Sequence, residues 1–193
     1  MTDVRGTAQL TQSPGLIDPT NAAWDDSRKP LVGQFRFKGR QVIVIGNHFI
    51  SKGGDDPLMG RFQPPSTPSE AQRLQQATVE RAFVDQIRAA DPDAAVVVLG
   101  DLNDFQFSNT ADTLVGDGYL TDLPRTLPEP EQYSYDFEGN SEVLDHILIS
   151  GALAAEPHEY DIVHINAEFA NQTSDHDPQV VRFPLFPIAG LLH

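Results

Sequence analysis

The residues best suited to chemistry lie in one polar segment near the C-terminus, residues 171–178. Asp175 is followed directly by His176, and both precede the apolar residues 179–183, which are typical of a β-strand. An aspartate offers hard oxygen ligands for Mg²⁺ or Ca²⁺, whereas an imidazole can carry a proton near neutral pH. The segment therefore predicts one strand end that combines a metal ligand with an acid–base group.

Further polar side chains stand at the end of apolar strand-like runs or within them: Asp101 and Asn103 after residues 94–99, His48 after residues 42–45, and Asp145 within residues 144–150. Asp101 and Asn103 are two residues apart, so both can face the same space. Asp145 has apolar neighbours on its side of the strand, and a carboxylate in such surroundings needs a partner. These strand ends each deliver a carboxylate, an amide or an imidazole, so together they predict one common site rather than unrelated turns.

In this order, the four segments resemble the C-terminal part of the endonuclease/exonuclease/phosphatase superfamily, to which pancreatic deoxyribonuclease belongs. Residues 17–21, 26–30 and 51–57 fit bacterial extracellular-nuclease-like members in particular. The resemblance extends from about Asp18 to Phe183 and implies an α/β fold, a four-layer sandwich of two mixed β-sheets flanked by helices. The family's first strand, with its asparagine, and the next strand, with its metal-binding glutamate, have no counterpart here. We therefore expect residues 1–193 to form a single, incomplete domain of this family.

The resemblance also implies a metal site. Asp101, Asn103 and Asp175 match the family's remaining ligands for Mg²⁺, with Mn²⁺ or Ca²⁺ as alternatives. Asp101 would in addition orient or deprotonate the attacking water, and Asn103 would contact the phosphate.

The same resemblance assigns catalytic roles to two histidines. Asp145 would orient His176 and raise its pKa by charge attraction. His176 would face the scissile phosphate, and His48 would protonate the leaving group or contact the phosphate. The family often has lysine where Ile50 stands, so that Lys52 could replace it. The predicted catalytic residues are His48, Asp101, Asn103, Asp145 and His176, whereas His146, on the opposite side of its strand, is expected to be structural.

Composition restricts the protein's class and partners. The 193 residues are 39% hydrophobic and 21% charged and contain no cysteine, which excludes disulfides, zinc–thiolate sites and thiol catalysis. No apolar run reaches the length of about 18 residues that a membrane-spanning helix needs. We expect no membrane span and no protein partner, and the N-terminus lacks the pattern of a signal peptide. The resemblance nevertheless implies an extracellular or periplasmic protein.

The net charge of −15 is unevenly distributed. Residues 1–61 contain 8 of the 13 basic residues and 6 of the 28 acidic ones, while residues 62–193 contain 5 basic and 22 acidic residues. Affinity for nucleic acid comes mainly from lysine and arginine that neutralise phosphates. A surface for a nucleic acid substrate would therefore use basic residues near the N-terminus: Arg28, Lys29, Arg36, Lys38, Arg40, Lys52 and Arg61.

The elements expected to position these residues alternate between strands and helices. Residues 1–28 read as irregular, and a capping box at residues 67–70 opens a helix that extends to Ala90, with an apolar stripe of Val79, Ala82, Phe83, Ile87 and Ala90. Patterning predicts hairpins at residues 31–45 and 133–150, a buried strand at 94–99, a short helix at 108–115, and final strands at 160–166 and 179–183. A strand, a helix and a second strand in succession indicate a layered α/β domain.

The sequence favours a metal-dependent phosphodiester hydrolase, a nuclease acting on DNA or RNA. Two alternatives stay open. One is a phosphatase or lipid-headgroup phosphodiesterase of the same superfamily, because the core motifs are shared. The other is a catalytically inactive fragment or an acidic cation-binding module, which the absence of the family's glutamate ligand favours.

Overall fold

The computed structural model describes residues 6, 10 and 12–184. Its elements, in chain order, are β1 (Gly15–Leu16), the 3-10 helix η1 (Ala22–Trp24), β2 (Leu31–Phe37), β3 (Arg40–His48), α1 (Glu70–Ala90), β4 (Val96–Asp101), α2 (Asn109–Val115), β5 (Leu120–Asp122), η2 (Leu123–Thr126), η3 (Glu129–Glu131), β6 (Tyr135–Phe137), β7 (Asn140–Glu142), β8 (Asp145–Ser150), α3 (Gly151–Ala154), β9 (Glu159–Ile162) and β10 (Gln179–Arg182).

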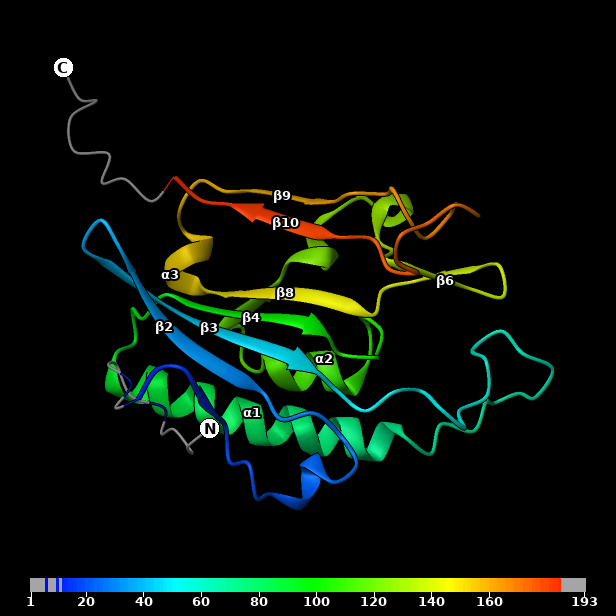
Figure 1. Ribbon diagram of the computed structural model, residues 1–193, viewed down its shortest axis with the longest axis horizontal. Coiled ribbons are helices and arrows are strands. Elements are labelled where there is room, and N and C mark those ends of the chain that lie inside the picture. The colour runs from blue at the N-terminus through cyan, green and yellow to red at the C-terminus, as the bar shows by residue number, and fades with distance from the viewer. Residues whose placement is uncertain (1–5, 7–9, 11, 185–193) are drawn as a thin grey trace.

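The centre of the molecule is a six-stranded mixed sheet in the order β1-β2-β3-β4-β8-β5. Among the described strands of this sheet, only β3 and β4 pair in parallel, and helix α1 lies in the connection between them. Helices α1 and α2 lie against one face of the sheet (Figure 1), where Ile45 and Val98 pack with Phe83, Ile87 and Leu114 in the main apolar core. The predicted α/β class is therefore confirmed.

The opposite face of the sheet is covered by β9 and β10, which form a separate two-stranded sheet (Figure 1). Val97, Ile147 and Ile149 pack there with Tyr160 and Val181 in a second apolar cluster. Across residues 6, 10 and 12–184, this layer contains two strands, so the second large sheet of the expected four-layer sandwich is not shown.

Helix α1 begins close to the predicted capping box and ends at the predicted residue, but its buried face differs from the expected stripe. Phe83 and Ile87 are buried as predicted, whereas Ala82 and Ala90 are exposed. Three polar side chains are buried on this helix instead: Arg73, Gln76 and Glu80. Each has hydrogen-bond partners in neighbouring segments, which is what allows a polar group to be buried at moderate cost.

The second predicted hairpin is divided between two sheets. Strands β6 and β7 pair with each other over residues 135–142, whereas β8 leaves the hairpin at Val143 and enters the central sheet between β4 and β5. This division is a correction to the single hairpin over residues 133–150. The division matters for function. Strand β8 places Asp145 in the central sheet, whereas β6 and β7 form a separate two-stranded sheet beside it.

The N-terminal segment is less irregular than expected. Residues 1–5, 7–9 and 11 of it lie outside the described residues, but the remainder includes β1 and η1, and Ile17 and Trp24 are buried in the main core. Within the described residues, no helix combines the length and apolarity needed to cross a bilayer.

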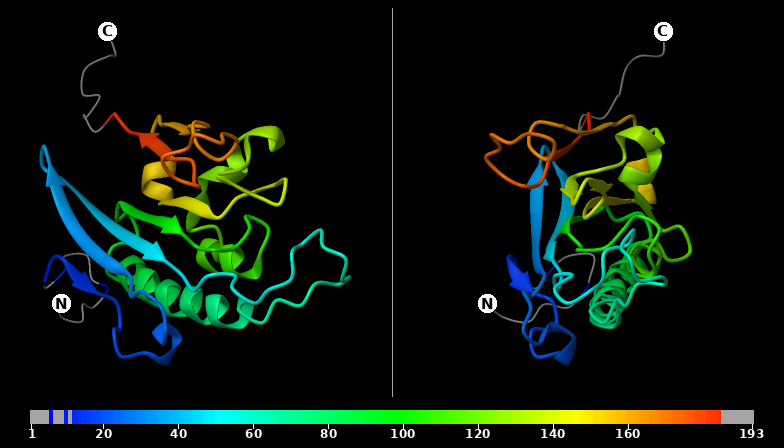
Figure 2. Two further views of the ribbon diagram at one scale, coloured as in Figure 1. Left: turned by 45° about the vertical axis from the view of Figure 1, so that its right-hand side comes forward. Right: turned by 90° about the vertical axis from the view of Figure 1, so that its right-hand side faces the viewer.

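The loop of residues 49–69, between β3 and α1, projects beyond the edge at which β3 and β4 end (Figures 1 and 2).

Candidate active site

Three candidate catalytic residues form a row across adjacent strands of the central sheet. His48 is the last residue of β3, Asp101 the last of β4, and Asp145 the first of β8. His48 is in register with Asp101, and Asp101 with Asp145. Because paired residues of neighbouring strands point to the same face, all three side chains stand on the face away from α1. The register of the sheet therefore brings together residues separated by almost 100 positions in the sequence.

The end of β4 and the turn after it have a backbone that favours this arrangement. Gly100 has a φ of +129°, and a Cβ atom there would collide with the backbone of Asn47. Asn103 has a φ of +50°, a region that asparagine enters more readily than most residues. Its backbone N–H donates to Oδ1 of Asp101 at 2.7 Å, and its side-chain Nδ2 donates to the carbonyl of Phe49 at 3.1 Å. The turn thus fixes both Asp101 and Asn103 against the end of β3.

His48 and Asp101 face each other, with Nε2 of the imidazole 3.4 Å from Oδ2 of the carboxylate. The histidine side chain is 40% exposed and the aspartate side chain 14% exposed, so that the imidazole is open to the solvent side of the pair. Burial and the nearby charge of Asp145 raise the pKa of Asp101. A raised pKa makes this carboxylate a better proton acceptor than an ordinary surface aspartate.

The predicted contact between Asp145 and His176 is present. Nδ1 of His176 lies 2.6 Å from Oδ2 of Asp145, and the hydroxyl of Ser134 donates to the same oxygen at 2.8 Å. The hydrogen bond to Asp145 raises the pKa of His176, which favours the imidazolium form. A backbone bridge between His176 and Tyr135 holds this segment beside β6, and the centres of their two rings are 4.8 Å apart.

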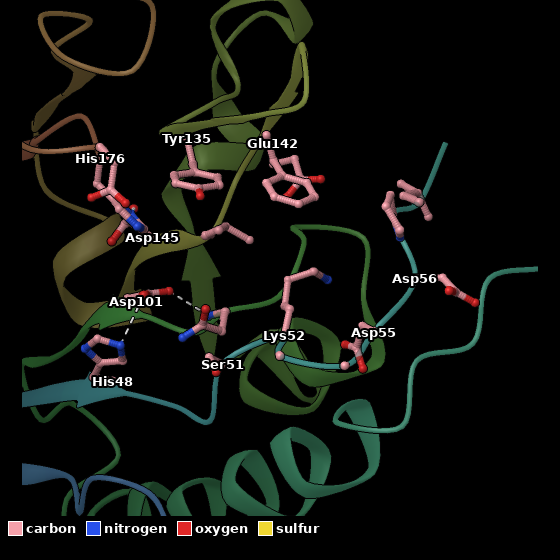
Figure 3. Close-up of a pocket in the computed structure, with 18 residues that line it drawn as sticks. His48, Ser51, Lys52, Asp55, Asp56, Asp101, Tyr135, Glu142, Asp145 and His176 are labelled. Carbon is pink, nitrogen blue, oxygen red and sulfur yellow. Dashed lines mark hydrogen bonds and ion pairs between the residues drawn. The ribbon is translucent and has the colours of Figure 1, made fainter. Parts of the chain in front are cut away.

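All six residues predicted for catalysis or metal binding line one cavity of about 790 Å³: His48, Asp101, Asn103, Asp145, Asp175 and His176. Figure 3 shows the cavity between an upper row with His176, Tyr135 and Glu142 and a lower row with His48, Asp101 and Lys52. The upper row comes from the hairpin β6–β7 and the segment before β10, and the lower row from strand ends and the loop of residues 49–69.

The side chains around the cavity fit a divalent cation. Asp101, Asp145 and His176 each offer one ligand atom within 4.8 Å of the others. This group differs from the predicted set of Asp101, Asn103 and Asp175, although the two sets share Asp101 and all five residues line the same cavity. Two carboxylates that face each other in a half-buried site repel, and a bound cation would offset that repulsion. The donors are mainly oxygens, which suit hard cations such as Mg²⁺, Mn²⁺ or Ca²⁺.

A buried ionic network, which the sequence did not reveal, anchors the loop that walls the cavity. Arg73 of α1 is 1% exposed and lies 3.0 Å from Asp55 of the loop and 3.1 Å from Asp104, the residue after Asn103. Thr110 donates a hydrogen bond to Asp104 at 2.6 Å. Arg73 therefore connects the loop, the helix and the turn that carries Asp101 and Asn103.

Lys52 of the same loop lines the cavity and points across it toward Glu142 (Figure 3). Its ammonium group lies 3.8 Å from the centre of the Phe105 ring, and burial lowers its pKa. Burial also raises the pKa of Glu142. Lys52 thus supplies positive charge to a cavity in which carboxylates predominate.

His146 lies outside this cavity, as expected from its position opposite Asp145. It is buried, with Nδ1 3.0 Å from Oδ1 of Asp122 and Nε2 3.0 Å from the carbonyl of Asp104. Both ring nitrogens of His146 therefore have protein partners, and its structural role stays a prediction.

A buried carboxyl group lies directly behind the end of β3. Asn47, the neighbour of His48, donates from Nδ2 to Oε1 of Glu80 at 2.8 Å, and Oε2 of Glu80 has no hydrogen-bond partner among the described residues. Burial raises the pKa of Glu80 to about 8. The group is therefore neutral at pH 7 in the folded protein, whereas it ionises above about pH 4.3 in the unfolded chain.

This difference predicts that the free energy of unfolding falls as pH rises between these two pKa values, since the unfolded chain releases the proton first. Glu80→Gln should remove this contribution. Between pH 5 and pH 8, the free energy of unfolding of the parent should therefore fall by about 4 kcal/mol relative to that of the variant. Thermal unfolding of both proteins across this range measures the effect, with the exposed Glu129→Gln as control. Parallel pH profiles of parent and Glu80→Gln would contradict the prediction.

Comparison with known proteins agrees with this geometry. Residues 7–177 match the model of an endonuclease/exonuclease/phosphatase family. No curated protein matches the sequence. Among solved structures, truncated TDP2 from Caenorhabditis elegans is 19% identical with a TM-score of 0.65, and the match covers 95% of this chain and 67% of that one.

Two other structures are also similar. A variant of the 3′ phosphatase NExo from Neisseria, bound to a product DNA hairpin, is 21% identical with a TM-score of 0.57, and the match covers 90% of this chain and 73% of that one. Sphingomyelinase C from Streptomyces griseocarneus is also 21% identical, with a TM-score of 0.55 and coverage of 80% and 57%. The chain thus spans little more than half the length of that enzyme. By its match over residues 7–177, this chain belongs to the endonuclease/exonuclease/phosphatase family.

Proposed function

We propose that this protein is a metal-dependent phosphodiester hydrolase that acts on nucleic acid. The observation that carries the proposal is the row of His48, Asp101 and Asp145 at the ends of three adjacent strands. His176 completes this row across the same cavity. The row combines carboxylate ligands, a carboxylate with a raised pKa and two imidazoles, the group types that phosphodiester hydrolysis needs.

Each residue has a role that follows from its contacts. Asp145 holds His176 by its Nδ1, so that Nε2 is directed away from the pair and can donate a hydrogen bond to a phosphoryl oxygen. Asp101 accepts the proton of the attacking water, and the more exposed His48 protonates the leaving oxygen. A divalent cation held by Asp101, Asn103 and Asp175 would polarise the phosphoryl group. Lys52 offers a further positive charge to the substrate.

Nucleic acid is the substrate that we favour, with DNA and RNA both open. The similar Neisseria enzyme is described with a DNA hairpin product, which supports this choice by analogy. The acidic surface predicts weak binding that depends strongly on salt and on bound cations.

We also propose an extracellular or periplasmic location. We further propose that β9 and β10 belong to the second sheet of a four-layer sandwich.

A lipid-headgroup phosphodiester is the second candidate substrate. The loop of residues 49–69 borders the cavity and exposes Leu58, Met59 and Phe62, an apolar surface that could contact lipid. The similarity to a sphingomyelinase agrees with this alternative. Parallel assays on supercoiled plasmid, single-stranded oligonucleotide, a phosphomonoester and sphingomyelin vesicles, each with Mg²⁺ or with EDTA, test the proposal. Cleavage of none of them in Mg²⁺ or Mn²⁺ would contradict it.

The metal site gives a prediction that does not depend on turnover. Mg²⁺ and Mn²⁺ should bind weakly, since few protein oxygens are available and the cation keeps several of its waters. Binding should be lost in Asp101→Ala and weakened in Asp175→Ala, while Asp161→Asn on the exposed edge of β9 serves as control. Isothermal titration calorimetry measures these affinities. Submicromolar binding that survives Asp175→Ala would show that the ligands are misassigned.

A further inference from the structure

The hairpin β6–β7 presents two aromatic rings to the cavity. Tyr135 and Phe137 are two residues apart on β6, so they lie on the same face of the hairpin, and both line the cavity. Their ring centres are 6.4 Å apart and their planes differ by only 16°. Phe137 remains 39% exposed although it is a large apolar side chain. The pair forms an aromatic surface with nearly parallel ring planes, and solvent can reach it at Phe137.

This surface begins at the proposed catalytic centre and leads away from it. The Tyr135 ring is 4.8 Å from that of His176, and Phe137 lies farther along the strand. A ligand group on this surface would therefore lie beside a phosphate that His176 contacts. On the opposite wall, Lys52 offers a positive charge (Figure 3). The cavity thus presents an aromatic surface, a catalytic cluster and a cation within one space.

The geometry of the two rings indicates what they bind. A quaternary ammonium group is bound by aromatic faces directed at it, and a neighbouring lysine would repel it. Here the two planes are nearly parallel, and Lys52 lines the same cavity. A flat, neutral ring joined to phosphates fits better, because it can stack on Tyr135 and Phe137 while Lys52 attracts a phosphate. This combination is a nucleotide unit of a polynucleotide.

We propose that Tyr135 and Phe137 stack an unpaired nucleobase next to the scissile phosphate, so that the enzyme prefers single-stranded or frayed nucleic acid. The inference rests on the proposed function, because it names the substrate class of that same site. A base within a duplex has its faces covered by its neighbours and cannot lie on this surface unless it is first unstacked.

The test measures binding to an oligonucleotide that is not consumed. A single-stranded phosphorothioate oligonucleotide that carries 2-aminopurine should lose fluorescence on binding in Mg²⁺, because the probe stacks on the rings. Phe137→Ala should weaken binding about tenfold. Phe137→Trp should retain binding, since it keeps an aromatic face. The control is Phe35→Ala, which removes a 60% exposed ring of β2 that does not line the cavity, and it should leave binding unchanged.

An oligonucleotide with an abasic residue in place of 2-aminopurine distinguishes the loss of base stacking from a general disturbance of the binding site by the substitution. It should bind to the parent and to Phe137→Ala with equal affinity, measured by anisotropy of a terminal label. Equal losses on both oligonucleotides, or no loss on either, would overturn the proposal. Phosphocholine binding that depends on Phe137 while oligonucleotide binding does not would also overturn it, in favour of the lipid headgroup. If the parent protein stacks the base but cleaves no phosphodiester, the result would support base stacking on the aromatic surface and contradict the proposed hydrolase function.

Discussion

His176→Ala and Asp101→Ala are each expected to slow metal-dependent phosphodiester cleavage by about 10²–10⁴-fold, because each removes a group that donates or accepts a proton. His176 is held on Asp145 with its other nitrogen directed away from the pair, and Asp101 has a raised pKa that suits a proton acceptor. Initial rates of plasmid nicking or oligonucleotide cleavage in Mg²⁺, with the purified variants, measure the loss.

The control for this prediction is His158→Ala. His158 is a partly buried histidine whose Nδ1 lies 2.8 Å from the carbonyl of Glu156, and it does not line the catalytic cavity. Its replacement should leave the rate within about twofold of the parent. Thermal unfolding of all variants distinguishes lost chemistry from lost folding. Parent-like rates in both His176→Ala and Asp101→Ala would exclude the assignment of this cavity as the active site.

The positions of the polar residues at strand ends could be predicted from the sequence, because apolar β-branched runs mark buried strands clearly. Residues 94–99 and 42–45 are two such runs, and the chain after each leads to Asp101 or His48. The contact between Asp145 and His176 was predicted by the resemblance and not by the pattern, since 31 positions separate them. The register that aligns His48, Asp101 and Asp145 depends on pairing between strands, which periodicity within one strand does not specify.

The parts that could not be predicted depend on contacts between distant segments. Arg73, Gln76 and Glu80 appear as polar residues of a helix, and helical periodicity assigns polar residues to the exposed face. Arg73 and Glu80 are buried because Asp55, Asp104 and Asn47 approach from the loop and the strand ends. Gln76 is buried because the backbones of Ala23 and Ile50 pair with its side chain. For a similar reason, the sequence pattern predicted a single hairpin over residues 133–150, in which β6, β7 and β8 were not distinguished. Only tertiary structure shows that the chain changes sheets at Val143.

The burial of these polar groups has a functional meaning. Arg73 holds the loop that contributes Lys52, and Glu80 supports Asn47 beside His48. Helix α1 therefore reaches the cavity through two side chains that do not line it. A helix face that would be apolar in an ordinary layered domain has instead become the support of the candidate site, and such local departures from pattern are expected where function imposes them.

Asp145→Asn should fold and yet lower catalysis by about 10–100-fold, because asparagine retains the shape of the residue but not the charge that orients His176. The hydrogen bond to Asp145 is the main cause of the raised pKa of His176. In the variant this pKa should fall toward the ordinary value of about 6.5 or below it. NMR titration of the His176 ring in metal-free buffer measures the change, and the ring of His158 in the same spectra provides the control.

The same pair predicts how stability depends on pH. Because the pKa of His176 is raised in the folded protein, the stabilisation from the pair is fully present below the unfolded pKa and is lost as pH rises through the folded pKa. The difference in unfolding free energy between parent and Asp145→Asn should therefore be largest in mildly acidic buffer and should shrink toward alkaline pH. A purely structural Asp145 would destabilise the variant at every pH and leave catalysis per folded molecule unchanged. If the His176 titration were identical in parent and variant, the pair could not act as a unit in solution, and His176 would need another orienting group.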